Sequence, residues 1–436
     1  MKRIYLKDLE THLNHEITLQ GFVDNIRDLQ YVQFIILRDI TEKVQITIEK
    51  NEENKKLNEI VSNLTNESTI KVVGRLLANS KVKLRGMELL PSEIIVTSKS
   101  LEELPFNFKN NDTALIDTKL DYRFIDLRNE KNTLIFKIQS CMIEAMRSYL
   151  YQENFIEINT PKIIGTASES GSEVFELKYF NQKAYLAQSP QFYKQMAMAS
   201  GLEKIFEVAP AFRAENSNTN RHATEFTSFD LEFSYINSFE DVMSFEEDLL
   251  IAGFTAVKNQ YGEQIKTLFN KEVIIPTKPF PRLKLNEVYQ ALADNYGYQI
   301  PKEDAGDLNS EAEKLTGKLA LKKYGHEFIF ITDYSFKKRP FYHMRKEGVP
   351  QGYDLIWRGC EITTGAQREH RYEILKKQAQ EKGLDKDVKF YLEFFKYGCP
   401  PHGGFGLGVN RLTMLMLGIT IKEAMFIFRG PNRLNP

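Results

Sequence analysis

A long polar segment between two apolar runs is the feature that most limits how this chain can fold. Residues 204–212 (KIFEVAPAF) and 227–236 (TSFDLEFSYI) have the β-branched and aromatic content of strands. A hairpin between two such strands needs only about two to five turn residues. The segment that joins them, within FRAENSNTNRHATEF (212–226), is longer, crowds charged and amide side chains together, and contains no Gly or Pro. We therefore predict an antiparallel strand pair whose loop does more than reverse the chain.

The composition narrows the class of protein. A chain of 436 residues with 42% hydrophobic and 12% aromatic side chains can form two or more domains with sizeable cores. Its formal net charge of −1 gives no global basic field, so any nucleic-acid partner must meet a local patch. Three cysteines are too few for a disulfide framework or a zinc site. Because the sequence has no apolar stretch of about 18 residues and no apolar signal core, we expect a cytoplasmic protein without a membrane segment.

The N-terminal part of the chain is predicted to form a small β-barrel. It contains five runs rich in β-branched residues, 17–23, 31–39, 43–49, 68–76 and 87–98, with a helical segment, 51–64, between the third and the fourth. That order is typical of an OB-fold, although another small barrel would have similar runs. Such barrels bind single-stranded nucleic acid with aromatic and basic side chains on one face. We assign residues 1–102 to this domain and expect Arg27, Phe34 and Gln45 on the binding face.

The rest of the chain is predicted to form an α+β domain. Residues 103–130 are polar and rich in turn formers, which indicates a linker before a second domain at 131–436. Helices are expected over roughly 133–152, 239–258 and 409–417, and strands at 174–187, 327–332, 352–357, 359–364 and 403–408. A further strand ends at Pro161, since proline cannot donate to a strand ladder. Because most strands follow one another through hairpins, we predict an antiparallel sheet flanked by helices.

Several polar groups stand where they can bind an anion. Arg213 and Glu215 are two residues apart, which points both side chains to one face of a strand. An arginine there can grip a phosphate or a carboxylate with two hydrogen bonds, and an ion pair with the glutamate is the plainer alternative. Arg221 and His222 are either solvated loop charges or groups that reach a polyphosphate. Phe226 is either a core residue or a stacking platform.

The segment GGFGLGVNRL (403–412) is a second candidate. Gly406 and Gly408 lie at alternate positions of a strand, where glycine weakens pairing unless a ligand or another backbone approaches closely. Arg411 falls in the first turn of the next helix, which the helix dipole disfavours for a cation unless an anion binds there too. Arg213 and Arg411 are therefore predicted to flank one polyanion.

The remaining candidate residues come from three short motifs. TASESGSEVF and QSPQFYKQ supply Glu169, Ser189, Gln191 and Lys194. A surface loop followed by an exposed helix would have the same composition. EITTGAQREH supplies Glu361, Thr364 and Arg368. The carboxylate and hydroxyl oxygens of the first two suit a hard cation such as Mg²⁺, whereas a capped turn is the alternative.

Together these segments resemble the class II aminoacyl-tRNA synthetases over essentially the whole chain. NFIEINTP resembles their first signature motif, with Pro161 at the dimer interface, FRAENSNTNRHATEF through FDLEF resembles the second, and GFGLGVNRL resembles the third. The N-terminal OB-fold is similar to that of the subgroup that charges aspartate, asparagine or lysine. TASESGSEVF, QSPQFYKQ and EITTGAQREHR resemble the compact archaeal and eukaryotic type of aspartyl-tRNA synthetase, which lacks the inserted domain of the bacterial type.

The resemblance implies a role for each candidate residue. The implied ATP-binding residues are Arg213, Glu215, Arg221, His222, Phe226, Glu361, Thr364, Gly408 and Arg411, with Mg²⁺ on Glu361 and Thr364. The implied aspartate-binding residues are Glu169, Ser189, Gln191, Lys194, Arg213, Asp230 and Arg368. Arg213, Arg411 and Glu361 are the implied catalytic residues. Arg27, Phe34 and Gln45 match positions that contact the anticodon.

The implied reaction joins L-aspartate to tRNA in two steps. The aspartate carboxylate attacks the α-phosphorus of ATP to give aspartyl-adenylate and pyrophosphate, and the 3′-hydroxyl of tRNA(Asp) then displaces AMP. We expect a homodimer and leave open whether tRNA(Asn) is charged as well. We also expect Lys194 and Arg368 to reject asparagine, because a neutral amide would leave two buried cations without compensation.

Three alternatives share parts of this pattern. An asparaginyl-tRNA synthetase has the same fold and motifs, but Lys194 argues against it. A tRNA-independent asparagine synthetase has the same catalytic fold, but the OB-fold argues against it. A non-catalytic nucleic-acid-binding relative would have lost part of the set Arg213, Glu215, Glu361, Arg368 and Arg411.

Overall fold

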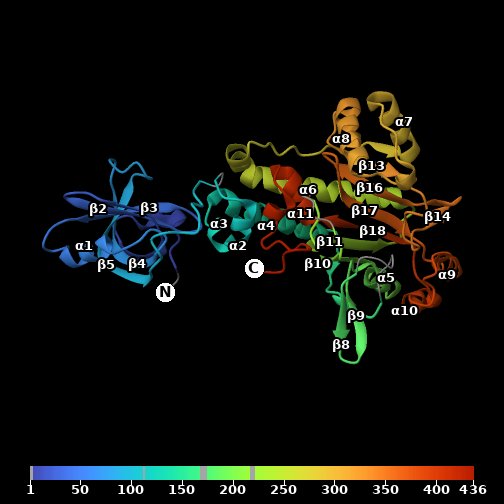
Figure 1. Ribbon diagram of the computed structural model, residues 1–436, viewed down its shortest axis with the longest axis horizontal. Helices are drawn as coiled ribbons and strands as arrows, with labels where there is room; N and C mark the ends of the chain where they lie inside the picture. Colours follow the sequence, from blue (N-terminus) through green and yellow to red (C-terminus); the bar gives the residue numbers. More distant parts are fainter. Residues whose placement is uncertain (1–2, 111–112, 167–173, 217–220) are drawn as a thin grey trace. The chain divides into compact units, whose positions relative to one another are not determined.

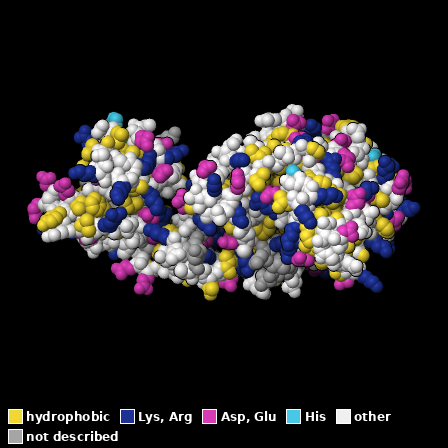
Figure 2. All heavy atoms as spheres, turned by 90° about the horizontal axis from the view of Figure 1, so that it is seen from above, with side chains coloured by type: hydrophobic (Ala, Val, Ile, Leu, Met, Phe, Trp, Pro, Cys, Tyr) yellow, Lys and Arg dark blue, Asp and Glu magenta, His cyan; other side chains and the backbone are white. Residues whose placement is uncertain are grey.

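The computed structural model describes residues 3–110, 113–166, 174–216 and 221–436 of the chain. The chain divides into two compact units, Met1–Asn107 and Phe108–Pro436 (Figure 1). On the face seen in Figure 2, Lys and Arg side chains lie among Asp and Glu side chains, as a net charge of −1 leads us to expect. None of the helices in the described ranges is long and apolar enough to cross a membrane.

The first unit is a closed barrel of five strands in the order β1-β2-β3-β5-β4. Its elements are η1 (Leu6–His12), β1 (Glu16–Asp28), β2 (Val32–Arg38), β3 (Lys43–Glu49), α1 (Lys55–Ser62), β4 (Thr69–Ala78) and β5 (Met87–Ser98). Alternate residues of β2 and β3 are buried, so their apolar side chains fill the barrel and the others face outward. The predicted strands and the helix between the third and the fourth are confirmed.

The second unit is built on an eight-stranded sheet in the order β12-β13-β16-β17-β18-β11-β10-β6. These strands are β6 (Ile156–Glu157), β10 (Lys204–Phe212), β11 (Glu225–Ser234), β12 (Arg282–Lys284), β13 (Phe328–Thr332), β16 (Gly352–Trp357), β17 (Cys360–Arg368) and β18 (His402–Gly408). Two smaller sheets contain β7 (Ile163–Ile164), β8 (Glu176–Tyr179) and β9 (Gln182–Leu186), and β14 (Arg345–Lys346) and β15 (Val349–Pro350). The large sheet is antiparallel in its centre, as predicted, but β12–β13 and β10–β6 pair in parallel at its edges.

One face of the large sheet packs against long helices. α4 (Glu130–Gln152), α6 (Phe239–Phe269) and α11 (Val409–Leu417) form the main apolar core with it (Figure 1). Phe229 and Leu231 of β11 belong to this core, whereas Ser228 and Asp230, at alternate positions, line a cavity on the opposite face. The other helices are α2 (Ile116–Asp121), α3 (Arg123–Asp126), α5 (Gln191–Ala199), α7 (Leu285–Tyr296), η2 (Lys302–Asp304), α8 (Ser310–Tyr324), α9 (Tyr372–Glu381), α10 (Lys389–Glu393), η3 (Phe394–Tyr397) and α12 (Ile421–Ala424).

The segment 103–130 is not a linker throughout. It contains α2 and α3, and from Phe108 onward it belongs to the second unit. Arg123 is buried, forms an ion pair with Asp126, and donates to the carbonyl oxygens of Glu423 and Met425 at 2.9 Å each. The polar composition of the segment did not predict this, because the carbonyl oxygens that accept from Arg123 belong to residues near position 425.

A carboxyl group lies buried beneath the sheet. Glu246 of α6 accepts a hydrogen bond from the Tyr353 hydroxyl at 2.7 Å. The Tyr353 ring covers Gly365 so closely that a Cβ there would lie 2.3 Å from its Cζ. Burial, helped by the charge of Glu247, raises the pKa of Glu246 from 4.5 to about 8. Between these values the folded chain holds one proton more than the unfolded chain, so this group lowers stability as the pH rises.

We therefore expect Glu246→Gln to stabilise the second unit relative to the wild type as the pH rises from about 6 to about 8. One proton gives a slope of up to about 1.4 kcal/mol per pH unit. Denaturant midpoints at a series of pH values check this, with Glu311→Gln, at an exposed ion pair, as the control. Parallel stability curves for the wild type and the Glu246 variant would contradict it.

Candidate active site

The polar face of the large sheet carries a cavity of about 290 Å³. The residues predicted to bind ATP or aspartate that line it are Ser189, Gln191, Arg213, Glu215, Arg221, His222, Phe226, Asp230, Glu361, Thr364, Arg368, Gly408 and Arg411. The side chains of Arg213, Arg368 and Arg411 thus share one cavity, as the predicted binding of a polyanion requires. Glu169, which was also predicted, lies outside the described residues.

The strand register explains why these residues meet. Asp354 of β16 pairs with Thr364 of β17, Thr364 pairs with Gly406 of β18, and Gly406 pairs with Asp230 of β11. Residues paired in this way point to the same face of a sheet, so the row puts two carboxylates and a hydroxyl on the cavity side. A Cβ at Gly406 would lie 2.9 Å from Asp230 Oδ1. This glycine therefore makes room for a neighbouring carboxylate, and it also lines the cavity.

One end of the cavity is rich in cations. Arg213 Cζ lies 5.4 Å from the centre of the Phe226 ring, and its Nη1 is 3.8 Å from Glu215 Oε1. Phe226 is half-buried and lines the cavity, so it is not a core residue. Arg411 Nη1 donates to the carbonyl oxygen of Glu361 at 3.0 Å. Both guanidinium groups are thus held beside the space in which a ligand would lie.

The loop between β10 and β11 supplies two more groups to this end. Arg221 Nη1 donates to Glu313 Oε2 of α8 at 3.1 Å, and the same oxygen accepts from the Glu361 N–H at 3.2 Å. Burial, together with the charge of Arg411, lowers the pKa of His222. His222 is therefore neutral at pH 7, and the arginines carry the positive charge.

Two carboxylates, Asp354 and Glu361, lie close to arginines that line the cavity. Thr364 Oγ1 donates to Asp354 Oδ1 at 2.8 Å and lies 3.4 Å from Glu361 Oε1. Arg339 forms a two-pronged ion pair with Asp354. Burial, together with the charge of Asp354, raises the pKa of Glu361 to about 7. Since burial is the main cause of this shift and repulsion by Asp354 adds to it, a cation bound beside the two carboxylates would favour the ionised form of Glu361. The oxygens present are the ligands that Mg²⁺ prefers.

The metal would need further ligands. Within the described ranges, no group of three or more His, Cys, Asp or Glu side chains is placed to hold an ion. Mg²⁺ is commonly held by one or two carboxylates together with phosphate oxygens of a substrate. The residues present therefore fit Mg²⁺ that arrives with a polyphosphate.

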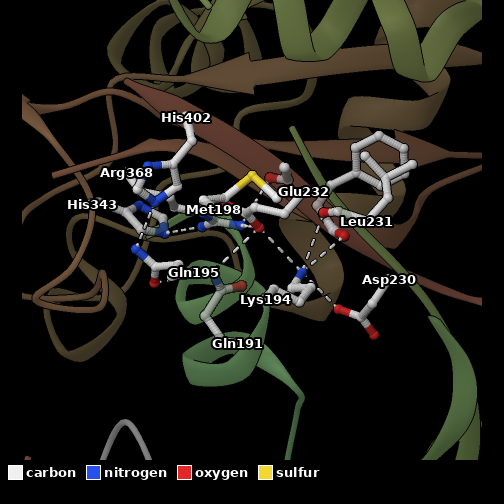
Figure 3. A network of polar contacts seen from close by, with 12 residues as sticks. Gln191, Lys194, Gln195, Met198, Asp230, Leu231, Glu232, His343, Arg368 and His402 are labelled. Atoms are coloured by element: carbon white, nitrogen blue, oxygen red, sulfur yellow. Dashed lines mark hydrogen bonds and ion pairs between the residues drawn. The ribbon is translucent and has the colours of Figure 1, made fainter. Parts of the chain in front are cut away.

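The other end of the cavity adjoins a network of four buried charges (Figure 3). Lys194 Nζ lies 2.9 Å from Asp230 Oδ1 and 3.5 Å from Glu232 Oε2. Arg368 Nε donates to Glu232 Oε1 at 2.9 Å. Although burial opposes its charge, Arg368 and Lys194 hold the pKa of Glu232 below its usual value. Two cations are thus paired with two carboxylates.

This network corrects our expectations about Lys194. Its side chain is 1% exposed and does not line the cavity, because it lies behind Asp230 and donates to the carbonyl oxygens of Leu231 and Phe405. The network also leaves no surplus positive charge, since Asp230 and Glu232 together balance Lys194 and Arg368. Unpaired cations therefore do not explain the rejection of a neutral side chain, and a direct contact between Lys194 and a substrate stays a prediction.

The predicted anticodon-binding residues lie together on the barrel. The register of β1, β2 and β3 pairs Arg27 with Phe34 and Phe34 with Thr47, next to Gln45. Arg27 is exposed, and Phe34 and Gln45 are half-buried on the outer side of their strands. The structure thus brings the three residues to one face.

Sequence reasoning missed Asp354, Glu232, Arg339 and His343. The two carboxylates lie in the strand sequences GYDLIW and FDLEF, where a charge inside an apolar alternation is a signal that could have been used. Arg339 and His343 belong to an irregular segment between β13 and β14, where no periodicity marks them.

Comparison with known proteins shows the family of this chain. Residues 116–428 match the family of class II tRNA synthetases (D, K and N), and residues 17–97 match the OB-fold nucleic acid binding domain. The chain is 43% identical to the aspartate--tRNA(Asp) ligase of Pyrococcus abyssi, over 98% of this chain and 100% of that protein. It is 42% identical to the aspartate--tRNA(Asp/Asn) ligase of Methanopyrus kandleri, over 100% of both.

A solved structure with the same fold is the asparaginyl-tRNA synthetase from Pyrococcus horikoshii complexed with asparaginyl-adenylate. It matches 100% of both chains with a TM-score of 0.89 and 30% identity. The family match covers more than half of the chain, and the relatives match it from end to end. This chain therefore belongs to the class II aminoacyl-tRNA synthetases of the D, K and N group, with an N-terminal OB-fold.

Proposed function

We propose that this enzyme attaches L-aspartate to the 3′ end of tRNA(Asp) through an aspartyl-adenylate. The observation that carries the proposal is the convergence of Arg213, Arg368 and Arg411 on one cavity. Two of these arginines suit a triphosphate, and the third, at the far end, suits the carboxylate of an acidic amino acid. The names of the two relatives quoted above support the same activity.

The first step is a reaction between two anions. ATP would lie at the cation-rich end, with Arg213 on the α-phosphate, Arg411 and Arg221 on the outer phosphates, and Phe226 against the adenine. The carboxylate of the amino acid attacks the α-phosphorus and releases pyrophosphate. Because this nucleophile is already ionised, no general base is required, and the arginines act by positioning the two anions and neutralising their charge.

Magnesium is part of the proposal. Glu361, Thr364 and Asp354 are the residues that would hold it, because they offer hard oxygen atoms within reach of the phosphate end. When bound, Mg²⁺ neutralises phosphate charge and fixes the geometry of the phosphate chain.

Selection of aspartate over asparagine would rest on the direction of hydrogen bonds. Arg368 has only donors, so a carboxylate can accept from it with either oxygen. An amide presents one acceptor and one NH₂ group, and the NH₂ group would face donors without a partner. A buried polar group left unpaired costs about 1–3 kcal/mol, which corresponds to roughly tenfold to a hundredfold in selectivity.

Two measurements test the proposed function. Pyrophosphate exchange should depend on aspartate and not on asparagine, and purified tRNA(Asp) should be aminoacylated. Exchange with asparagine alone would make the enzyme an asparaginyl-tRNA synthetase. Formation of asparagine from ammonia without tRNA would favour a tRNA-independent asparagine synthetase. Charging tRNA(Asp) and tRNA(Asn) side by side decides the tRNA range, since equal rates define a non-discriminating enzyme.

Phe34→Ala is expected to impair the second step and spare the first. Stacking of a base on an aromatic ring contributes about 1–3 kcal/mol, so kcat/KM for tRNA aminoacylation should fall by roughly tenfold to a hundredfold. Aspartate-dependent pyrophosphate exchange needs no anticodon and should stay within about twofold of the wild type. Phe22→Ala is the control, because Phe22 lies in β1 of the same barrel but is not one of the three predicted anticodon-binding residues. This variant should charge tRNA nearly as well as the wild type. If the Phe34 variant charges tRNA normally, the anticodon face is assigned wrongly.

The proposal extends to a homodimer at work in the cytoplasm. The resemblance of residues 154–161 to the first signature motif supports the dimer. So does the end of the large sheet at the short strand β6, where the Ile156 side chain is exposed. Light scattering on the purified protein tests it, and a monomeric mass at micromolar concentration would contradict it.

A further inference from the structure

Arg368, the arginine at the amino-acid end of the cavity, is held by polar contacts from different elements (Figure 3). Its Nε donates to Glu232 Oε1 at 2.9 Å, and its Nη2 donates to the carbonyl oxygen of Gly404 at 2.9 Å. Its Nη1 lies 3.3 Å from Nε2 of His343. The first two contacts come from the floor of the sheet, β11 and β18, whereas the histidine comes from the irregular segment that follows β13.

His343 is built firmly into this position. Its backbone forms an isolated bridge with Arg368, and its carbonyl oxygen accepts from Gln378 Nε2 of α9 at 3.0 Å. The residue is 2% exposed. The imidazole fills the space above Gly352, where a Cβ would lie 2.7 Å from Nδ1. The ring is therefore placed by the fold, and both it and Arg368 line the cavity.

The chemistry of the pair fixes the direction of the hydrogen bond. A guanidinium group has donors and no acceptor, so His343 Nε2 must accept and the ring proton must lie on Nδ1. This requires a neutral imidazole. Burial, together with the charges of Arg368 and Arg339, lowers the pKa of His343 well below its usual value, so the ring remains an acceptor at neutral pH.

The Nη1 nitrogen of Arg368 is the one that contacts His343. Glu232 and Gly404 fix one edge of the guanidinium plane, and Nη1 lies away from the Nε atom that Glu232 binds. A side chain without an acceptor at position 343 would remove the contact of this nitrogen with His343 Nε2. Misplacement of a binding group by a fraction of an ångström is enough to weaken a charge-assisted hydrogen bond.

We propose that His343 is a positioning residue that aims Nη1 of Arg368 at the side-chain carboxylate of the amino-acid substrate. This inference rests on the proposed function. It assigns to a residue outside all three signature motifs a share in the recognition of aspartate.

The test compares three variants by steady-state pyrophosphate exchange. His343→Leu removes the acceptor, and we expect it to raise KM for aspartate about tenfold or more while KM for ATP stays within about twofold. His343→Gln can place an amide oxygen near the position of Nε2, and we expect it to restore KM for aspartate to within about threefold of the wild type. Phe341→Leu is the matched control, because Phe341 is buried in the same segment but does not line the cavity. It should leave both KM values unchanged.

Calorimetric titration of L-aspartate in the absence of ATP gives a second readout that does not require turnover. The same order of affinities, wild type, then the Gln variant, then the Leu variant, supports the inference. Equal KM values for aspartate in the wild type and the Leu variant overturn it, and so does a parallel loss for aspartate and ATP. A wild type that exchanges no pyrophosphate with aspartate overturns the proposed function itself, which separates the two failures.

Discussion

Arg213→Gln is expected to lower kcat/KM for aspartate-dependent pyrophosphate exchange by about a hundredfold to a thousandfold. The side chain lines the cavity and is the first cation after β10, beside Phe226. In the proposed reaction it faces the α-phosphate, where the charge of the attacking carboxylate and of the phosphate must be neutralised at the same moment. Removal of one such preorganised donor typically costs a factor of that size. Glutamine keeps a polar group but is shorter and carries no charge.

Arg213→Gln should leave the fold intact, so a loss of pyrophosphate exchange would not be caused by unfolding. The Arg213 side chain is 47% exposed and its ion pair with Glu215 spans 3.8 Å. Ion pairs of this kind contribute about 0–1 kcal/mol to stability. Thermal unfolding should therefore be nearly unchanged. Exchange within about threefold of the wild type would show that the α-phosphate is bound elsewhere.

Lys194→Met is expected to lower the free energy of unfolding of the second unit by about 3–5 kcal/mol at pH 7. The ammonium group lies in a fully buried network and is bound to Asp230, with Glu232 close by. Methionine fills much of the volume but leaves two carboxylates with one cation between them. A buried charge that loses its partner has a large cost because water cannot replace the contact. Aspartate binding should weaken more than ATP binding, since Asp230 lines the amino-acid end of the cavity.

The matched control for this experiment is Lys183→Met. Lys183 also forms an ion pair with a carboxylate, Glu176 at 3.0 Å, but its side chain is 73% exposed. An exposed pair contributes about 0–1 kcal/mol, so the control should unfold at nearly the wild-type denaturant concentration. A Lys194 variant that unfolds within about 1 kcal/mol of the wild type would mean that the network is hydrated or otherwise compensated.

The surroundings of Lys194 could not be predicted from the sequence. The motif QSPQFYKQ pointed to Lys194 as a binding residue, and the structure places it next to the cavity but behind Asp230. Its charge is balanced by Asp230, which lies 36 positions later in the chain, and Glu232 of the same strand lies close by. No local pattern reveals such a pairing, because it depends on how helix α5 packs against β11.

Helix α8 is an element of secondary structure that the sequence alone did not predict. Gly317 in its interior lowers helix propensity, and the sequence there gave us no predicted element. The structure has a reason for this glycine, since a Cβ would lie 2.4 Å from the backbone nitrogen of Gly359. The close approach of α8 to the turn before β17 therefore compensates for a weak local preference.

The sequence by itself determined the elements with strong local periodicity and the residues whose chemistry is visible without partners. The alternation in β2 and β3, the apolar stripe of α4, the helix after GGFGLG and the arginines of the motifs belong to this class, because side-chain direction follows from the backbone period alone. Only the tertiary structure decided the parallel edges of the sheet, the inclusion of 108–130 in the second unit and the charge balance around Arg368. These depend on which distant groups meet in a buried place, where the energy of a charge is set by its neighbours and not by its position in the chain.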